Sequence, residues 1–373
     1  MLSSKEKTTA LYDKHVNLNA KIINFHGWSM PIWYESSTTE HMNVRNHIGL
    51  FDVSHMGQIF ISGKNAQKFL QRLTTNDVSR LGVGEGQYTF LCNHQGGIVD
   101  DLILYRIKED SYLLCVNSIN IEKDFSWLQK NKKDCEIIEI ENQSQYWSQL
   151  AVQGPKTLKA LIFLEKESIY QEICHLPFNQ IRSFSYHNSQ CYIARTGYTG
   201  EFGFEIYVKN EACVPMWNSI LDSGRDFSIK PIGLAARDTL RLEASFFLHG
   251  NDINENVSPF EAGAAWAVKL KKNSFIGQEQ LIQEKEHGSF RKIFAFKMED
   301  RAIPRHGMNI YQNKKKIGTV TSGAKFPSLD FFGGLALINL ENFNKNEVFY
   351  IDIRGQEKKA KLSQKPFYKS KAK

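Results

Sequence analysis

Alternating apolar and polar positions predict several strands in this chain, and apolar positions three or four apart predict several helices. The runs 58–62 and 192–195 alternate as half-buried strands do. Helical spacing recurs at about 64–75, 120–131, 155–164, 211–223 and 231–246. From residue 291 onward short β-like runs are separated by turn residues, which predicts a small β-rich C-terminal domain. The interspersed helices and strands indicate an α+β chain.

Length and composition narrow the class of protein. The 373 residues suggest two or three domains, at roughly 100–200 residues each. Hydrophobic residues make up 42% and charged residues 23%, which excludes a disordered, collagen-like or coiled-coil chain. No apolar run approaches the roughly 20 residues that span a bilayer, and residues 1–7 lack the apolar stretch of a signal peptide. We therefore expect a cytoplasmic protein with no membrane partner.

The net charge of +7 is concentrated at one end of the chain. Residues 354–373 hold eight basic residues and one acid, so residues 1–353 balance to zero. This distribution predicts either a solvated basic tail or a docking segment for an acidic partner, and it argues against a nucleic-acid partner. The sequence contains no dinucleotide-binding glycine pattern, no phosphate loop and no zinc-binding spacing of histidine or cysteine. We expect neither a metal nor a nucleotide.

Two acids interrupt an apolar strand in the most informative segment. Residues 88–92 and 98–105 flank a loop that contains Gly96 and Gly97, which predicts a hairpin. Strict alternation places Asp101 on one face with Val99, Ile103 and Tyr105, and Asp100 on the other with Ile98, Leu102 and Leu104. A carboxylate in such a strand needs a partner, and conflicts of this kind tend to mark functional sites. The alternative is that both acids contact only the turn.

Two further segments hold candidate ligand-binding residues. A glycine-rich turn over 195–201 leads into a strand where Glu205 can accept two hydrogen bonds from an amino-pyrimidine edge, or be merely exposed. Arg237 and Arg241 are four apart on a predicted helix, so they repel unless an anionic ligand or internal acids offset their charge. We expect His55 to be a core or hairpin histidine.

Six motifs in this order resemble the T-protein (aminomethyltransferase) family of the glycine cleavage system, over about residues 8–369. They are Gly-Trp-x-Met-Pro (27–31), Phe-Asp-Val-Ser-His-Met-Gly (51–57), Gly-Gly-Ile-Val-Asp-Asp (96–101), Arg-Thr-Gly-Tyr-Thr-Gly-Glu (195–201), Gly-Leu-Ala-Ala-Arg-Asp (233–238) and Lys-Pro-Phe-Tyr (365–368). His249 departs from the pattern, since relatives often have tyrosine there.

The resemblance implies a three-domain, cloverleaf-like α+β fold around a central folate channel, with a C-terminal β-barrel-like domain. The first domain would be discontinuous, formed by residues 1–59 and 147–252. The second, inserted domain would take residues 60–146 and 253–284, and the third residues 285–373.

The resemblance also implies the reaction, its partners and the site residues. An aminomethyl group on the dihydrolipoyl arm of H-protein passes to tetrahydrofolate, which releases ammonia and forms 5,10-methylenetetrahydrofolate. Asp101 matches the catalytic carboxylate, either as a proton shuttle or as a group that orients the folate and offsets positive charge. Glu205, Arg237, Tyr368, Tyr88, Tyr105, Tyr198 and Met56 match folate contacts and channel lining.

Rival hypotheses remain at this point. A folate-binding accessory protein of iron–sulfur assembly would share the fold, but we expect such a chain to lack the Asp-Asp hairpin and to carry a reactive cysteine motif. The folate domain of sarcosine or dimethylglycine dehydrogenases follows a flavin domain, for which 373 residues leave no room.

Overall fold

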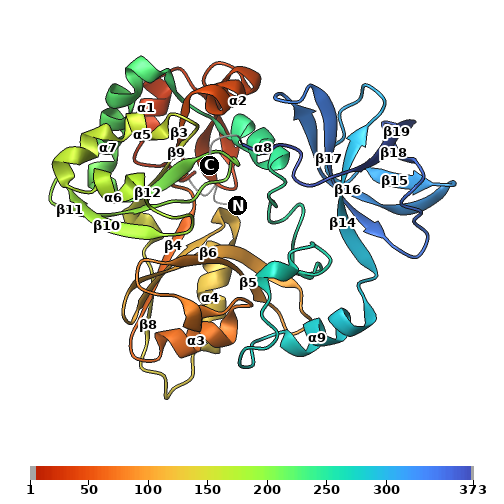
Figure 1. Ribbon diagram of the computed structural model, residues 1–373, viewed down its shortest axis with the longest axis horizontal. Coiled ribbons are helices and arrows are strands. Elements are labelled where there is room, and N and C mark those ends of the chain that lie inside the picture. The colour runs from red at the N-terminus through yellow and green to blue at the C-terminus, as the bar shows by residue number, and fades with distance from the viewer. Residues whose placement is uncertain (1–5, 371–373) are drawn as a thin grey trace.

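The computed structural model describes residues 6–370, so Lys371 and Lys373 of the basic segment lie outside the described residues. Three lobes surround a central region in which helix α8 (Leu234–Glu243) lies (Figure 1). Two lobes are built on open sheets and the third is a closed barrel. In this described range, no helix has the length and apolar character needed to cross a membrane.

The first lobe has a six-stranded sheet in the order β10-β11-β12-β9-β3-β13. Its strands are β3 (Ile48–Asp52), β9 (Trp147–Gln153), β10 (Ile181–Tyr186), β11 (Ser189–Ala194), β12 (Gly203–Lys209) and β13 (Ile229–Pro231). Its helices are α1 (Tyr12–Asn17), α2 (Ser37–Asn46), α5 (Thr157–Ala160), α6 (Tyr170–Cys174) and α7 (Asn210–Gly224), and β1 (Lys21–Phe25) pairs with β2 (Trp28–Trp33). The apolar face of α7, including Trp217, joins the sheet core.

The second lobe has a five-stranded sheet in the order β5-β6-β7-β4-β8. Its elements are β4 (Gly57–Ser62), α3 (Ala66–Leu73), β5 (Gly86–Cys92), β6 (Ile98–Lys108), β7 (Ser111–Val116), α4 (Ile121–Asn131) and β8 (Glu139–Asn142). Phe69 and Leu70 of α3 and Leu128 of α4 pack with the sheet as one core. The predicted hairpin is confirmed as β5 and β6.

The predicted alternation of side chains along β6 is wrong at its start. Asp100 pairs with Leu91 and Ile98 with Cys92, so Val99 is an extra, bulged residue. A bulge shifts the alternation by one residue. Val99 consequently packs with Leu91 in the core between the sheet and the helices α3 and α4. Ile98 packs with Cys92 on the opposite face of the sheet.

The third lobe is a closed barrel, which confirms the predicted C-terminal β-rich domain. Its strands close in the order β14-β17-β16-β15-β18-β19. They are β14 (Arg291–Met298), β15 (Asn309–Gln312), β16 (Lys315–Phe326), β17 (Phe331–Asn339), β18 (Phe349–Ile353) and β19 (Gln356–Ser363), and α9 (Gln278–His287) precedes them. The role of the basic segment stays a prediction, but residues 356–363 of it pair as β19, and Lys359 and Lys361 bind Glu299 at 3.1 and 3.0 Å.

A long segment between α8 and α9 connects the lobes. The amide of Ile98 in β6 donates to the carbonyls of Asn254 and Val257, and the amide of Lys269 donates to Thr75 beside β5. The half-buried Lys272 donates through its ammonium to three carbonyls between residues 71 and 76. These contacts hold the segment against the second lobe. The division into three domains at the predicted boundaries stays a prediction.

Candidate functional site

Asp101 lies on β6 just after the bulge, with its carboxylate partly exposed. The Tyr88 hydroxyl donates to Oδ2 at 2.9 Å, and the Asn117 amide donates to Oδ1 at 2.9 Å. Tyr88 comes from the neighbouring strand β5, and its ring stacks on Trp266 at 5.3 Å. Strand pairing and two hydrogen bonds therefore fix the direction in which this carboxylate points.

The proton affinity of Asp101 is unusual for an aspartate. Burial, followed by the charge of Asp100, raises its pKa to about 7, although the hydrogen bonds from Tyr88 and Asn117 act in the opposite direction. Burial disfavours the ionised form and a like charge nearby adds to that effect. This carboxyl can therefore take up or release a proton near neutral pH.

Glu205 on β12 is buried between small neighbours, since Ala151 and Ala194 are its partners on the adjacent strands. The Thr196 hydroxyl donates to Oε2 at 2.7 Å, and no residue between 6 and 370 donates to Oε1. The Tyr105 hydroxyl is 3.1 Å from the Thr196 hydroxyl, which links β6 of the second lobe to Glu205 of the first. Glu205 therefore keeps acceptor capacity for a ligand.

Arg237 on α8 and Tyr198 belong to the same group of side chains. The guanidinium lies 4.6 Å from the centre of the Tyr198 ring, and within the described part of the chain it has no hydrogen bond or ion pair. Burial lowers the pKa of Arg237. Burial raises the pKa of Tyr198 and the charge of Asp101 adds to this effect, whereas the charge of Glu205 opposes the fall at Arg237. Tyr198 therefore lies within electrostatic range of Asp101, and Arg237 within range of Glu205.

The two arginines that sequence analysis considered together have separate roles. Arg241 is fully paired, with Asp252 at 2.7 Å and Asp238 at 2.8 Å, as internal pairing predicts. Arg237 has no such acid, which is the arrangement expected of a cation that meets a ligand. Tyr198 is held in place because its hydroxyl donates to the Phe247 carbonyl and its ring stacks on Phe246.

Met56 and His55 lie in the turn that follows β3. Met56 is half-buried and packs against two clusters of buried side chains, one that contains Tyr105 and one that contains Phe51. His55 is buried, as predicted for a core histidine, and its ring packs edge-on against Phe25. Burial, then the charge of Arg237, lowers the pKa of His55 to about 3, so the ring is neutral.

Tyr368 occupies a different environment from the other predicted residues. Its ring lies under the Arg45 guanidinium at 3.8 Å, and its backbone amide donates to the Glu243 carbonyl at 2.9 Å. Arg45 in turn pairs with Glu201 and Glu243 at 2.9 Å each. Burial, and then Glu201, raises the pKa of Tyr368 to about 12. These contacts attach the C-terminal segment to α2 and α8.

Sequence analysis missed Asn117 and Trp266. Asn117 directly follows β7, which pairs with β6, but no motif distinguishes it from any asparagine at a strand end. Trp266 is 61% exposed although it stacks on Tyr88, and an exposed tryptophan is visible only in the folded chain. Pairing across strands and loops far apart in sequence brings both residues to the site.

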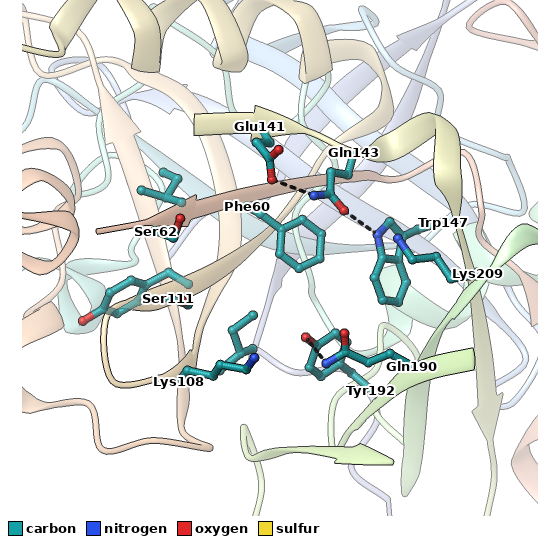
Figure 2. Close-up of a pocket in the computed structure, with 13 residues that line it drawn as sticks. Phe60, Ser62, Lys108, Ser111, Glu141, Gln143, Trp147, Gln190, Tyr192 and Lys209 are labelled. Carbon is teal, nitrogen blue, oxygen red and sulfur yellow. Dashed lines mark hydrogen bonds between the residues drawn. The ribbon is translucent and has the colours of Figure 1, made fainter. Parts of the chain in front are cut away.

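A separate cavity of about 210 Å³ lies between the first two sheets, and its lining includes none of the predicted site residues. Figure 2 shows Phe60 near the centre of the view and Trp147 beside it, with Gln143 accepting from the indole at 3.0 Å and donating to Glu141 at 2.7 Å. Lys209 lies 4.0 Å from the Trp147 ring. Glu141, Gln143 and Trp147 are hydrogen-bonded to one another there, and Gln190 donates to the Tyr192 hydroxyl at 2.9 Å.

Comparisons with known proteins agree over nearly the whole chain. The family models of the GCVT N-terminal domain and the glycine cleavage T-protein C-terminal barrel domain match residues 11–272 and 291–369. Aminomethyltransferases of Caldanaerobacter subterraneus subsp. tengcongensis and Flavobacterium psychrophilum are 45% and 44% identical, over 97% of this chain and 96% and 99% of theirs. The crystal structure of glycine cleavage system aminomethyltransferase T from Bartonella henselae has a TM-score of 0.89 at 32% identity, covering 98% of this chain and 99% of that one.

Proposed function

The chain belongs to the T-protein family of the glycine cleavage system and is an aminomethyltransferase of that system, and we propose that Asp101 is at its reacting centre. The observation that carries this proposal is the set of groups around one partly exposed carboxyl. Asp101 is fixed by Tyr88 and Asn117, has a pKa raised to about 7, and lies within electrostatic range of Tyr198, whose ring is 4.6 Å from the Arg237 guanidinium.

The acceptor in this proposal is tetrahydrofolate, which the family resemblance implies. The open oxygen of Glu205 accepts hydrogen bonds from the amino-pyrimidine edge of the pterin, and the Arg237 guanidinium lies against the ligand beside Tyr198. Four residues along β6 separate Tyr105, near Glu205, from Asp101, about 13 Å at the usual strand rise. A ligand that spans this distance contacts both acids.

The donor in this proposal is the aminomethyl group on the dihydrolipoyl arm of H-protein. Its carbon leaves sulfur and nitrogen and bonds to two folate nitrogens, each of which gives up one proton. One of these protons leaves with ammonia and the other with the dihydrolipoyl thiol. Asp101 hydrogen-bonds the exocyclic reactive nitrogen, accepts its proton and offsets the positive charge of the iminium-like carbon.

The non-catalytic accessory hypothesis is not favoured. Asp101 is present in the hairpin, and the curated relatives that match the full chain are aminomethyltransferases. The direct test supplies aminomethylated H-protein and tetrahydrofolate and follows 5,10-methylenetetrahydrofolate. Product formation supports the proposed substrates, while folate binding without product would contradict the proposed role.

Glu205→Gln is expected to raise the KM for tetrahydrofolate about 10- to 100-fold, with a smaller change in kcat. The reason is that a hydrogen bond to a charged group contributes about 1.5–3 kcal/mol, and glutamine replaces an acceptor oxygen by a donor. Steady-state kinetics with varied folate measure this. Glu211→Gln, at an exposed acid at the start of α7, is the matched control and should leave KM unchanged. An unchanged KM for Glu205→Gln would refute the pterin contact.

The rate of product formation is expected to rise with pH through a midpoint near 7. Asp101 accepts a proton only when it is ionised, and its pKa of about 7 places that ionisation above the range of an ordinary aspartate. Single-turnover rates from about pH 5.5 to pH 9 measure the midpoint. A midpoint near 4 would contradict the role of Asp101 as proton acceptor. A midpoint that stays the same when Asp101 is replaced would contradict it too.

A further inference from the structure

A third carboxyl lies behind Asp101, on the face of the sheet that α4 covers. Asp124 on α4 is fully buried, and neither of its oxygens accepts a hydrogen bond from a donor group in residues 6–370. A buried carboxylate without a donor carries the full cost of desolvation, so the protonated acid is favoured.

The groups that face Asp124 do not supply a free positive charge. Asp100 faces it from β6, and the charges of both Asp100 and Asp101 disfavour a further anion there. Its neighbour Lys123 donates to the Val99 carbonyl at 2.8 Å and to Glu255 at 2.9 Å. His249 lies 4.0 Å from Asp100, and burial lowers the pKa of its ring. The surroundings therefore do not compensate a second anion.

Asp100 is the opposite case, because donors surround it. It is fully buried and accepts from the Asn117 backbone amide at 3.1 Å, the Asn117 side chain at 2.8 Å and the Asn120 side chain at 2.5 Å. The start of α4 brings Asp124 to Asp100, because Asn120, one turn before Asp124, donates to Asp100 and Lys123 donates to the Val99 carbonyl. Two carboxylates this near to each other repel unless one carries a proton, and Asp100 has donors whereas Asp124 has none among residues 6–370.

We propose that Asp124 keeps its proton at neutral pH and donates it in a hydrogen bond to the Asp100 carboxylate, which is thereby held as a buried anion next to Asp101. Asp124 is a positioning residue, since it acts through Asp100 and touches no substrate. The charge of Asp100 is the second cause, after burial, of the raised pKa of Asp101. The link to catalysis rests on the proposed role of Asp101, whereas the location of the proton does not.

Infrared difference spectroscopy locates the proton without any substrate. At about pH 9 Asp101 is ionised, so the C=O stretch of a buried carboxylic acid in the parent protein reports Asp124. We expect this band to be present in the parent and in Asp101→Asn, and to be lost in Asp124→Asn. Asp222→Asn, at an acid that is 66% exposed, is the control and should leave the band unchanged. Absence of the band from the parent and from Asp101→Asn would overturn the proposal, even if Asp124→Asn failed to fold.

The pH midpoint of turnover provides a second readout that a merely structural role would not move. Asp100→Asn removes the anion and is expected to lower the midpoint by about one unit or more. Asp124→Asn replaces one neutral donor by another and is expected to leave the midpoint within about half a unit of the parent. A fall in Asp124→Asn equal to that in Asp100→Asn would mean that Asp124 is ionised, and would overturn the proposal.

The two proposals fail in different ways. Full activity of Asp101→Asn together with an infrared band that depends on Asp124 would refute the role of Asp101 and retain the proton on Asp124. Loss of activity in Asp101→Asn without such a band would support the role of Asp101 and refute the proton on Asp124.

Discussion

Asp101→Asn is expected to lower the rate of 5,10-methylenetetrahydrofolate formation by about 10²- to 10⁴-fold, the usual contribution of a general acid or base. Asparagine keeps the size, and its oxygen can accept from Asn117 while its NH2 donates to the Tyr88 oxygen, yet it can neither accept a proton nor offset a positive charge. Single-turnover mixing with aminomethylated H-protein and saturating tetrahydrofolate isolates the chemical step. A loss of less than about tenfold in both Asp101→Asn and Asp101→Ala would contradict both proposed roles.

The same variant is expected to be at least as stable as the parent above pH 7, which separates loss of chemistry from loss of folding. The pKa of Asp101 is about 7 in the folded protein, against about 3.9 for an ordinary aspartate. The folded state therefore binds this proton more tightly, and the stability gained from it is lost as pH rises through about 7. Asparagine does not titrate there. Denaturant unfolding at pH 5 and pH 8 measures the difference.

Arg241→Met is expected to destabilise the protein by about 3–5 kcal/mol, the usual cost of removing one partner of a buried ion pair. Arg241 is 2% exposed and donates to Asp252 at 2.7 Å and to Ser322 of the barrel at 2.9 Å. Its loss leaves the carboxylate of the fully buried Asp252 with only the Ser322 hydroxyl and the Leu248 amide as donors. Because Arg241 of α8 and Asp252 both hydrogen-bond Ser322 of β16, the barrel should also loosen from α8.

Arg225→Met is the matched control for this prediction. Arg225 pairs with Asp222 at 2.5 Å, but the two side chains are 75% and 66% exposed. Exposed pairs contribute about 0–1 kcal/mol, because water and salt screen them. Denaturant unfolding of both variants gives the comparison, and equal small losses would mean that the buried pair does not hold the lobes together.

The local elements could be predicted from the sequence because their signals are local. The hairpin of β5 and β6 follows from two apolar runs around Gly96 and Gly97, and the helices α3, α4, α7 and α8 follow from apolar spacing. The C-terminal barrel follows from repeated short strands and turns. The motif order identified the α+β fold and the family, which the comparisons confirm.

The composition of the site depended on contacts that no periodicity contains. The alternation rule failed at Val99 because a bulge adds one residue to a strand, which is a property of the pairing with Leu91 and Cys92. The basic run 356–363 became a barrel strand because β14 and β18 were available to pair with it.

The sequence by itself therefore determined the elements, the fold class and the family of this protein, and it identified Asp101 and Glu205 as chemically unusual acids. Only the tertiary structure decided which acids share an environment. Asn117 follows the next strand, β7, and Asp124 lies on the helix after it, α4. Glu205 belongs to a different lobe. Burial depends on packing in space, so the pKa of Asp101 is raised only when the folded chain buries this carboxyl beside Asp100.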